Sequence, residues 1–481
     1  MAENITSPRT DYARWYQDVI REAELADKAP VRGCMVIRPY GYAIWEAIRA
    51  GLDRRFRETG HENAYFPLFI PKSFIDKESE HVEGFAPELA VVTHGGGREL
   101  EEPLIVRPTS ETIINYMFAK WVQSYRDLPL LINQWANVVR WELRTRPFLR
   151  TTEFLWQEGH TAHASKQEAV EEALRMLRVY ESFAVEDAAI PVIPGIKTER
   201  EKFPGAVDSY SIEAMMGNGW ALQAGTSHYL GTNFARAFNI QFLNEANELE
   251  YVHQTSWGVS TRMVGAVIMA HGDEHGLRLP PGLAPIQVVV VPIWRGDDTR
   301  AAVLEECQRL RARLAEDGLR VRLDDRDTQS PGFKFNYWEV RGVPLRIEIG
   351  PRDLESGSVT AARRSRPGSE GKHSLPLDEG IAAGIRRILD EIQAELYDQA
   401  LERREGWTTE VSDYAELSRL IEEKGGFFRC YWDGSREDEE RLQEETKATV
   451  RCIPIDQPGT SGRCVVSGRE TDRIAVIARA Y

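Results

Sequence analysis

The stretch WANVVRWELRTRPFLRTTEFLWQEGH, residues 135–160, decides the fold because it reads as two strands joined by a long basic loop. β-Branched and aromatic side chains dominate both arms, residues 135–141 and residues 151–156, which is typical of paired strands. Side chains alternate between the two faces of a strand, so Arg140 and Glu142 are predicted to share one face. Unlike charges beside aromatic rings are costly to bury unless they meet a ligand or each other, so this hairpin is a candidate site.

Length and composition indicate a globular protein of about three domains, since the chain has 481 residues, of which 42% are hydrophobic and 28% are charged. The N-terminus lacks the cationic head and apolar run of a signal peptide, and the longest apolar run, near residues 288–293, is too short to span a bilayer. We therefore expect a cytoplasmic protein with no membrane partner. The 5 cysteines are widely spread and odd in number, so we interpret them as reduced thiols.

The net charge of -15 argues against binding of nucleic acid through the overall field, because phosphate contacts need a local excess of lysine and arginine. A local basic surface is still compatible with it. The tract AARRSRPGSEGK, residues 361–372, concentrates basic residues in one loop-like stretch.

The first part of the chain predicts an α+β fold. Residues 40–57 have helical apolar spacing that stops at Gly60, a suitable C-cap. Further helices are predicted over residues 112–125 and 166–187. Strand-like runs occupy residues 206–214, 219–226 and 250–259. Together with the hairpin they predict a mostly antiparallel sheet with helices packed around it.

A Pro/Gly hinge, LPPGLAP at residues 279–285, is the best domain boundary in the sequence. Strands then alternate with helices as far as residue 395, which predicts a small α/β domain. The composition changes again to a Glu- and Arg-rich helix followed by short strands. We therefore expect three domains: an α+β domain at 1–283, an α/β domain at 284–395 and a small α+β C-terminal domain at 396–481.

Three motifs in the first domain carry a resemblance to a known class. They are GHENAYFPLF at residues 60–69, RWE at residues 140–142 with its basic loop, and HQTSWGVSTRMVGA at residues 253–266. Their order and spacing, followed by an α/β domain, resemble the class II aminoacyl-tRNA synthetases. RPTSET at residues 107–112 and LQAGTSHYLGTNF at residues 222–234 look like the prolyl-tRNA synthetase family, and the resemblance covers essentially the whole chain.

The resemblance implies ATP-dependent activation of L-proline to prolyl-adenylate and transfer to tRNA(Pro). The carboxylate attacks the α-phosphorus in line and pyrophosphate leaves, so positioning and electrostatics carry most of the catalysis. The planar fork of Arg140 suits a bridge between the carboxylate and the α-phosphate. Arg140, Glu142 and Arg262 are the implied catalytic residues, and Mg²⁺ is implied as the companion of ATP. The implied ATP-binding residues are Arg140, Glu142, Arg150, Thr151, Phe154, Gln223, Thr226, Ser260 and Arg262.

The resemblance also implies an amino-acid pocket. Thr109 and Glu111 would take the secondary ammonium of proline, while Arg140 would hold its carboxylate. The implied walls around the ring are Trp156, His160, Phe203 and His228. Each residue also has a structural interpretation: Thr109 and Glu111 as a helix cap and a first-turn acid, the aromatic residues as core, the histidines as buried and hydrogen-bonded, and the charged residues as an ion-pair network.

The stretch from residue 161 to residue 251 separates the second and third motifs and leaves no room for a large hydrolytic editing insertion. Bacterial-type members of the family carry this insertion between the two motifs. The chain therefore looks like the archaeal and eukaryotic type of the family. A hydrophobic pocket discriminates by only ~1–3 kcal/mol per methylene, so we expect slow mischarging with alanine.

The α/β domain is expected to read the anticodon, because splayed single-stranded bases are recognised by stacking and base-edge hydrogen bonds. The candidates are the basic stretch Arg363, Arg364 and Arg366 together with Phe333, Lys334 and Glu339. A charged loop on a solvated surface is the alternative interpretation.

The third domain departs from the family, whose members commonly hold zinc there with two cysteine pairs. The matching positions here are Asp433, Asp438, Cys464 and Ser467. Such a set is a poor structural zinc site, so we expect no zinc. The final residue, Tyr481, matches a terminal tyrosine whose carboxylate in the family points toward the catalytic domain.

A homodimer is implied, because the first motif builds the subunit interface in this class. Two alternatives stay open from the sequence. One is a synthetase-like paralogue that charges a different acceptor, and the other is a non-catalytic, tRNA-binding or regulatory derivative. The presence of Arg140, Glu142 and Arg262 counts against the second, which would have no reason to keep a phosphate clamp.

Overall fold

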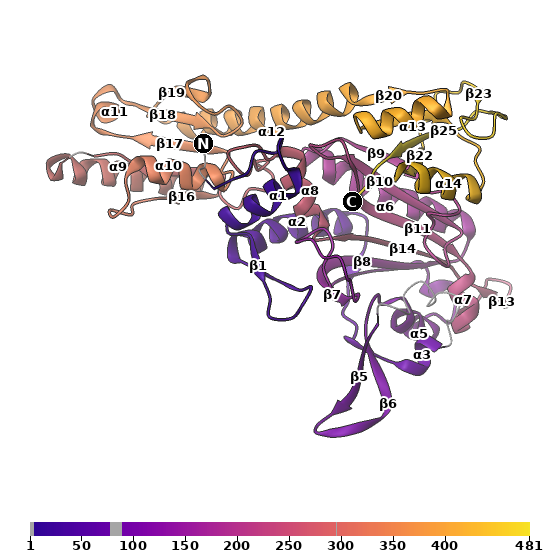
Figure 1. Ribbon diagram of the computed structural model, residues 1–481. Coiled ribbons are helices and arrows are strands. Elements are labelled where there is room, and N and C mark those ends of the chain that lie inside the picture. The colour runs from indigo at the N-terminus through magenta and orange to yellow at the C-terminus, as the bar shows by residue number, and fades with distance from the viewer. Residues whose placement is uncertain (1–3, 77–88, 295) are drawn as a thin grey trace.

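The computed structural model describes residues 4–76, 89–294 and 296–481, and its centre is an eleven-stranded sheet (Figure 1). The strand order is β20-β21-β25-β22-β9-β10-β11-β14-β8-β7-β3. The strands are β3 (Glu62–Asn63), β7 (Leu130–Val139), β8 (Glu153–His163), β9 (Val192–Ile196), β10 (Asp208–Met215), β11 (Ala221–Gly231), β14 (His253–Ser260), β20 (Thr408–Glu410), β21 (Phe427–Tyr431), β22 (Thr449–Pro454) and β25 (Ile474–Ala478).

The predicted hairpin is present. β7 and β8 pair antiparallel from Val139 opposite Glu153 to Leu130 opposite Ala162. The next strands, β14, β11, β10 and β9, continue the antiparallel sheet. The expectation of an α+β fold built on an antiparallel sheet is therefore confirmed.

Helices cover one face of this sheet and form the main hydrophobic core with it. They are α1 (Tyr12–Glu22), α2 (Pro39–Glu58), α6 (Lys166–Glu186) and α8 (Arg262–His271). α6 begins in a capping box in which Ser165 and Glu168 each bond the other's backbone N–H, as the sequence S-x-x-E favours. Large rings such as Trp15, Tyr180 and Trp257 fill the space between helices and sheet.

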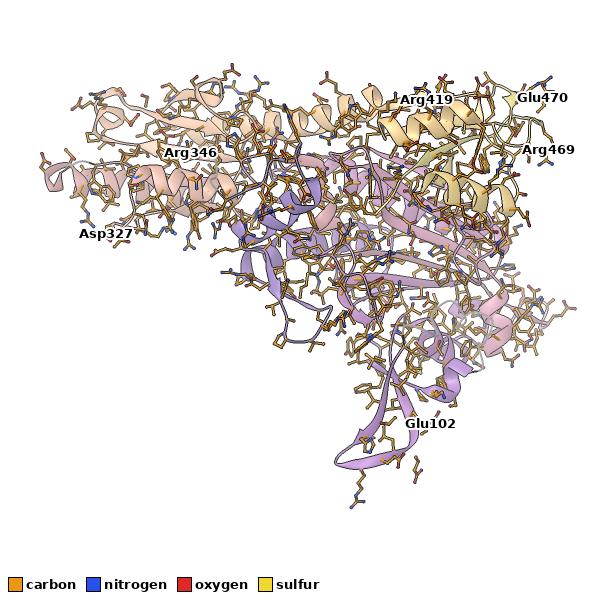
Figure 2. The ribbon with its side chains drawn as sticks, in the orientation of Figure 1. Glu102, Asp327, Arg346, Arg419, Arg469 and Glu470 are labelled. Atoms are coloured by element: carbon orange, nitrogen blue, oxygen red, sulfur yellow. The ribbon has the colours of Figure 1, made fainter. Side chains whose placement is uncertain are left out.

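Smaller elements surround the hairpin. They are β1 (Ala26–Lys28), β2 (Met35–Ile37), β4 (Phe69–Pro71), α3 (Lys72–Asp76), β5 (Ala90–Gly95), β6 (Arg98–Val106), α5 (Glu111–Trp121), η2 (Tyr125–Asp127), α7 (Asn233–Phe238), β12 (Gln241–Leu243) and β13 (Leu249–Tyr251). β5 and β6 form an arm that projects away from the body and carries Glu102 (Figures 1 and 2).

A second, five-stranded sheet of order β16-β15-β17-β18-β19 forms the predicted α/β unit. In this order the first two pairs, β16–β15 and β15–β17, are parallel, and the last two, β17–β18 and β18–β19, are antiparallel. Its elements are β15 (Val288–Pro292), α9 (Asp297–Glu316), β16 (Val321–Leu323), α10 (Pro331–Val340), β17 (Leu345–Ile349), α11 (Pro351–Ser356), β18 (Ser358–Arg363), η3 (Ser369–Gly371) and β19 (Lys372–Pro376). The basic tract is only partly a loop, because it begins inside β18.

A long helix, α12 (Ile381–Gly406), leads from the α/β unit to residues 408–481, which we call the C-terminal unit (Figure 1). Besides β20, β21, β22 and β25 this unit holds α13 (Tyr414–Glu423), α14 (Arg436–Thr446), β23 (Gly462–Arg463) and β24 (Glu470–Thr471). Its β22 pairs with β9, so the C-terminal unit extends the central sheet. The expected limit between residues 395 and 396 falls within α12, and the domain limits stay a prediction.

Among the described residues, no helix combines the length and the apolar character needed to cross a bilayer.

Candidate active site

The central sheet holds a cavity of about 440 Å³ beside the β7–β8 hairpin, β11, β14 and the loop that follows β9. Every residue that the sequence predicted for amino-acid or ATP binding contributes to its wall. In chain order these are Thr109, Glu111, Arg140, Glu142, Arg150, Thr151, Phe154, Trp156, His160, Phe203, Gln223, Thr226, His228, Ser260 and Arg262. Arg140 and Glu111, on which the assignment depends most, therefore face a common space. The role of each residue stays a prediction.

Arg140 lies just beyond β7 and not within the strand as the alternation predicted. The ladder with β8 ends at Val139, opposite Glu153. One more backbone bond, from Arg140 N to Thr152 O at 2.8 Å, precedes the long loop. The prediction that Arg140 and Glu142 share a strand face is thus wrong, because the arms separate one residue too early. The loop itself brings both side chains to the cavity wall.

Neighbouring groups orient the Arg140 guanidinium. Its Nε donates to Pro108 O at 3.0 Å, which ties the hairpin to the segment that leads into α5. Its central carbon lies 5.5 Å from the Phe154 ring centre and 5.3 Å from the Trp156 ring centre. The cation–π contacts and the hydrogen bond to the Pro108 carbonyl therefore hold the guanidinium in one orientation at the cavity wall.

Cationic groups gather at one end of the cavity. Arg262 begins α8 and donates from Nε to Leu149 O at 3.3 Å. Burial, and then the charges of Arg140 and Arg150, lower the pKa of Arg262 to about 10. Arg150 Nε also lies 3.2 Å from a carboxylate oxygen of Glu142 across the loop. Several guanidinium groups on one cavity wall favour a polyanion beside them.

Thr109 and Glu111 converge at the other end. Glu111 is the first residue of α5 and is buried, and its carboxylate accepts a hydrogen bond from the Thr109 hydroxyl. The Ser110 side chain makes no capping bond to α5. Thr109 is therefore not the cap of α5, whereas Glu111 is the acidic residue of the first turn that the structural interpretation named. The shared hydroxyl and carboxylate are also suited to an ammonium.

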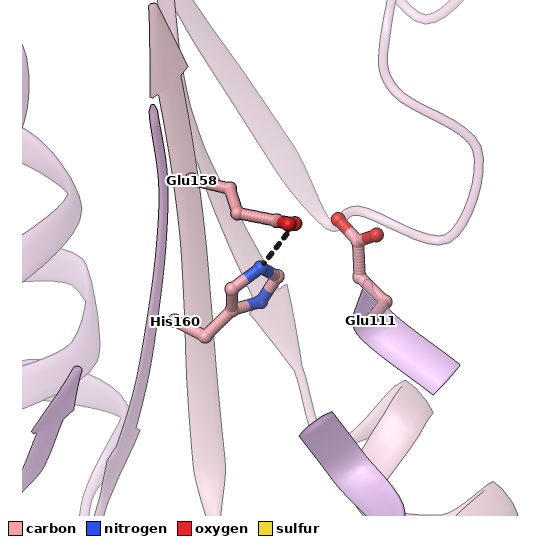
Figure 3. Close-up of side chains that lie close together, drawn as sticks. All are labelled: Glu111, Glu158 and His160. Carbon is pink, nitrogen blue, oxygen red and sulfur yellow. Dashed lines mark hydrogen bonds and ion pairs between the residues drawn. The ribbon is translucent and has the colours of Figure 1, made fainter. Parts of the chain in front are cut away.

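Glu158 and His160, both on β8, lie beside Glu111, the first residue of α5. Figure 3 shows the hydrogen bond between the Glu158 carboxylate and the His160 imidazole. Glu158 accepts from His160 Nε2 at 3.0 Å, from Gln134 Nε2 at 2.9 Å and from Ser110 N at 3.2 Å. Burial would raise the pKa of Glu158, but the bonds from His160, Ser110 and Gln134 hold it below the ordinary value. Burial would likewise lower the pKa of His160, yet Glu158 and Glu111 hold it above the ordinary value.

The pKa of His228 is lowered, whereas that of His160 is raised. Burial, and then the charges of Lys197 and His160, lower the pKa of His228 to about 3, so its ring is neutral. It stacks on Phe203 with ring centres 4.7 Å apart and contacts Ser209 Oγ through Nδ1 at 2.8 Å. This neutral stack forms a flat apolar wall.

Three polar residues are among those of the cavity wall that the sequence prediction missed. Glu158 could have been found, because alternation in WQEGH places it on the same strand face as Trp156 and His160. Ser256 Oγ is buried and finds no partner among the described residues, so a bound ligand or water can satisfy it. Lys197 had no local signal, since its partners Glu213 and Arg451 come from other strands.

One group of residues in the described part of the chain is compact enough to hold a metal ion. The ligand atoms of Glu111, Glu158 and His160 all lie within 4.8 Å of one another. The group does not fit a metal well, because Glu158 already accepts from three protein donors, His160 among them. The negative charge of Glu111 suits an ammonium group bound between Glu111 and Thr109 instead of a metal ion.

The degenerate zinc positions are used differently. Asp433 pairs with Arg469 at 2.7 Å, and its N–H donates to Cys464 Sγ at 3.1 Å. Asp438 belongs to the capping box of α14, and Ser467 Oγ accepts from Arg469 N at 3.2 Å. Two hard carboxylates that already have partners do not fit a tetrahedral zinc site. That the chain holds no zinc stays a prediction.

The anticodon candidates have mixed surroundings. Arg363, Arg364 and Arg366 each pair with a carboxylate, those of Glu391, Asp273 and Glu395 respectively. Lys334 is buried and donates to Asp324 O at 3.0 Å, whereas Phe333 is 47% exposed and stacks on Tyr337. Glu339 is partly exposed and its carbonyl accepts from Arg364 at 2.9 Å. Phe333 is therefore the candidate best placed to meet a base.

Fold and cavity together define a class II aminoacyl-tRNA synthetase. Residues 92–271 match the tRNA synthetase class II core domain (G, H, P, S and T), and residues 287–386 match an anticodon binding domain. Residues 414–481 match the C-terminal domain of prolyl-tRNA synthetases.

Full-length relatives narrow the class. The chain is 60% identical over 481 residues to a proline–tRNA ligase of Roseiflexus castenholzii, covering 100% of this chain and 99% of that protein. It is 59% identical to the proline–tRNA ligase of Chloroflexus aggregans, with the same coverage. It is 56% identical over 483 residues to a chloroplastic/mitochondrial proline–tRNA ligase of Arabidopsis thaliana, covering 100% of this chain and 89% of that protein. The chain belongs to the proline–tRNA ligase family.

Proposed function

We propose that this chain uses ATP to activate L-proline as prolyl-adenylate and then transfers the prolyl group to tRNA(Pro). The observation that carries the proposal is the shared cavity, whose wall holds the Thr109 hydroxyl and the Glu111 carboxylate together with the guanidinium groups of Arg140 and Arg262. A zwitterionic amino acid can place its ammonium at the first and its carboxylate at the second. The attacking oxygen then lies beside the phosphate-binding groups.

Ring selection is proposed to come from the apolar walls. Trp156 stands on one strand, while the stacked Phe203 and His228 come from a loop and another strand. Flat rings on several sides suit a stiff pyrrolidine better than a flexible side chain. His160, with its raised pKa, offsets the charge of Glu158 and leaves Glu111 for the ammonium.

Activation is proposed to rest on electrostatic stabilisation of the phosphate. Arg140 contacts both the carboxylate and the α-phosphate, and its fork matches two acceptors at once. Arg150 and Arg262 hold the outer phosphates and the adenine, against which Phe154 stacks, while Glu142 reads the adenine amino group. Thr151, Gln223, Thr226 and Ser260 complete the nucleotide wall, the ribose being held by Gln223 and Thr226. Mg²⁺ is proposed to enter with the nucleotide, because polyphosphates bind this cation.

We also propose how the anticodon is read, where the protein works and how many chains assemble. The α/β unit would read the anticodon with Phe333, and the protein would work in the cytoplasm as a homodimer. In support of the dimer, β3 is an edge strand of the central sheet, and the nearby Tyr65 and Phe69 are 73% and 44% exposed. Light scattering should give twice the mass of the chain, and the mass of a single chain would contradict the dimer.

ATP–pyrophosphate exchange with a panel of amino acids, followed by charging of tRNA(Pro), tests the function. We expect exchange to depend on proline and the charged product to be prolyl-tRNA. Exchange with proline but no charging would indicate a paralogue with another acceptor. Binding of tRNA without exchange would indicate a non-catalytic derivative. Either result would overturn the proposal.

A further inference from the structure

A buried ionic cluster joins the C-terminal unit to the floor of the cavity. Lys197 Nζ donates to Glu213 Oε1 at 2.7 Å and to Arg451 O at 2.6 Å. Arg451 Nε donates to Glu213 Oε2 at 3.1 Å. Glu213 is fully buried, and Lys197 and Arg451 are each 7% exposed. Removing one member would leave a buried charge short of a partner, so the cluster fixes its members tightly.

Two further contacts from the C-terminal unit reach the next residues of the same loop. Thr198 Oγ1 donates to Glu439 Oε2 on α14 at 2.9 Å. Arg200 donates to Gln443, one turn further along α14. Strand pairing of β22 with β9 leads directly into this loop. The C-terminal unit thus holds the loop of residues 197–204 at three of its first four positions.

The second half of this loop faces the cavity. Glu201, Lys202, Phe203 and Pro204 all contribute to the cavity wall. Phe203 N donates to Ser209 Oγ at 3.0 Å, and the Phe203 ring stacks on His228. A shift at the anchored half therefore moves the ring that closes the amino-acid end of the cavity.

We propose that the C-terminal unit is a working part of the amino-acid pocket, in which Arg451 and Glu439 are positioning residues that hold the loop of residues 197–204 and so place Phe203 against the substrate ring. This inference rests on the proposed function, since it takes proline as the substrate. Arg140, Phe154 and Arg262 come from the hairpin and α8, outside the loop. Arg451 and Glu213 nevertheless act electrostatically on Arg262, so only a variant that leaves every charge in place should leave the nucleotide contacts unchanged.

The test compares Arg451→Met and Thr198→Val with the parent in proline-dependent ATP–pyrophosphate exchange. We expect the KM for proline to rise about tenfold for Arg451→Met and about threefold for Thr198→Val, because small displacements of a positioning group are costly. For Thr198→Val, which changes no charge, the KM for ATP should change less than about twofold. The ratio of kcat/KM for alanine to that for proline should rise, since alanine does not need the Phe203 wall.

Arg404→Met is the matched control. Arg404 is a partly buried arginine whose Nη1 donates to Val192 O at 3.2 Å, at the opposite end of β9 from the loop. Its removal also weakens packing on β9 but should leave the KM for proline and the alanine ratio unchanged. Arg451→Lys retains a cation beside Glu213 and should restore part of the proline KM.

Different outcomes would refute the proposed function and the positioning role of the C-terminal unit. A parent protein without proline-dependent exchange would refute the proposed function itself. An active parent, with variants whose KM for proline equals that of the parent, would overturn the inference. So would a fall in kcat alone that matches the loss of active sites counted by an adenylate burst, because this is the sign of partial unfolding. If Arg451→Met does not fold, Thr198→Val decides the question, since it removes the bond to Glu439 and the weaker 3.4 Å bond from Glu201 N, but no charge.

Discussion

Arg140 is the side chain on which the proposed activation chemistry depends most. A carbonyl bond to Pro108 and the rings of Phe154 and Trp156 hold its guanidinium in one orientation. A donor that is already oriented needs no reorganisation when charge develops on the phosphate. The shape of the fork then matters as much as the positive charge, because a lysine cannot contact two acceptors in one plane.

Arg140→Lys is therefore expected to lower kcat/KM for pyrophosphate exchange about 10²–10³-fold, the usual cost of one lost transition-state donor. Steady-state exchange kinetics with proline and ATP measure it. Arg144→Lys, in the same loop but outside the cavity wall, serves as the control and should stay within about twofold of the parent. Equal losses in the two variants would show that the loop tolerates no lysine and would remove Arg140 from the phosphate site.

The pKa of Glu439 gives a prediction for stability. Burial, and then the charge of Glu201, raise it from 4.5 to about 7 despite the Thr198 hydrogen bond, and the residue is 4% exposed. The folded state therefore keeps its proton while the unfolded state loses it between these values. Stability is fully present below about pH 4.5 and is lost as pH rises to about 7, by on the order of 3 kcal/mol.

Glu439→Gln should remove this loss, since a glutamine keeps an acceptor for Thr198 but has no proton to release. Thermal or urea unfolding from pH 5 to pH 8 should show the variant more stable than the parent at the upper end and similar at the lower end. Glu440→Gln, at an exposed neighbour on α14, should keep the parental slope. A parental slope in Glu439→Gln as well would contradict the buried-acid explanation.

At the scale of single residues, the sequence predicted best where a motif carries its own geometry. Thr109, Glu111, Arg140 and the others lie on one cavity wall as expected. Lys197 escaped prediction because a buried charge is explained only by its partners. Those partners, Glu213 and Arg451, lie on strands that no local pattern brings together.

Among the secondary-structure elements, too, those defined by local sequence signals could be predicted and those defined by distant partners could not. The β7–β8 hairpin and α6 could be predicted, because alternation and capping signals lie within each segment. The pairing of β22 with β9 could not, since it joins strands more than 250 residues apart in the sequence numbering. Gly195 allows this pairing. A Cβ atom there would lie 2.6 Å from Cys452 Cβ and 2.8 Å from Ile453 O.

Gly195→Ala should therefore force β22 away from β9 and destabilise the protein by about 1–3 kcal/mol, the usual cost of overpacking. Urea unfolding with matched m-values measures the change. Gly332→Ala is the control, because a Cβ at Gly332 in α10 meets nothing within 4 Å and alanine favours a helix. That variant should be as stable as the parent or slightly more so. Equal stability of Gly195→Ala would mean that the two strands can separate without cost.

On the scale of the whole molecule, one sheet connects the cavity to the C-terminal unit (Figure 1). The three-part architecture could be predicted from composition and the Pro/Gly hinge. The continuity of the sheet could not, because it depends on how separately folded segments pack. The described chain between β8 and β14 is accounted for by α6, β9, β10, β11, α7, β12 and β13, which leaves no segment there for an inserted hydrolytic domain.

We therefore expect discrimination against alanine to depend on the proposed proline-binding cavity. Proline and alanine differ by two ring methylenes, worth roughly 2–6 kcal/mol together, so alanine should be activated slowly but measurably. Charging of tRNA(Pro) with labelled alanine should accumulate product, and purified alanyl-tRNA(Pro) should decay at the same rate with the protein as in buffer. Prolyl-tRNA(Pro) under identical conditions controls for non-specific hydrolysis. Decay of the alanyl ester that scales with protein concentration would show that the chain clears its own errors, and the cavity would then need a second, hydrolytic role.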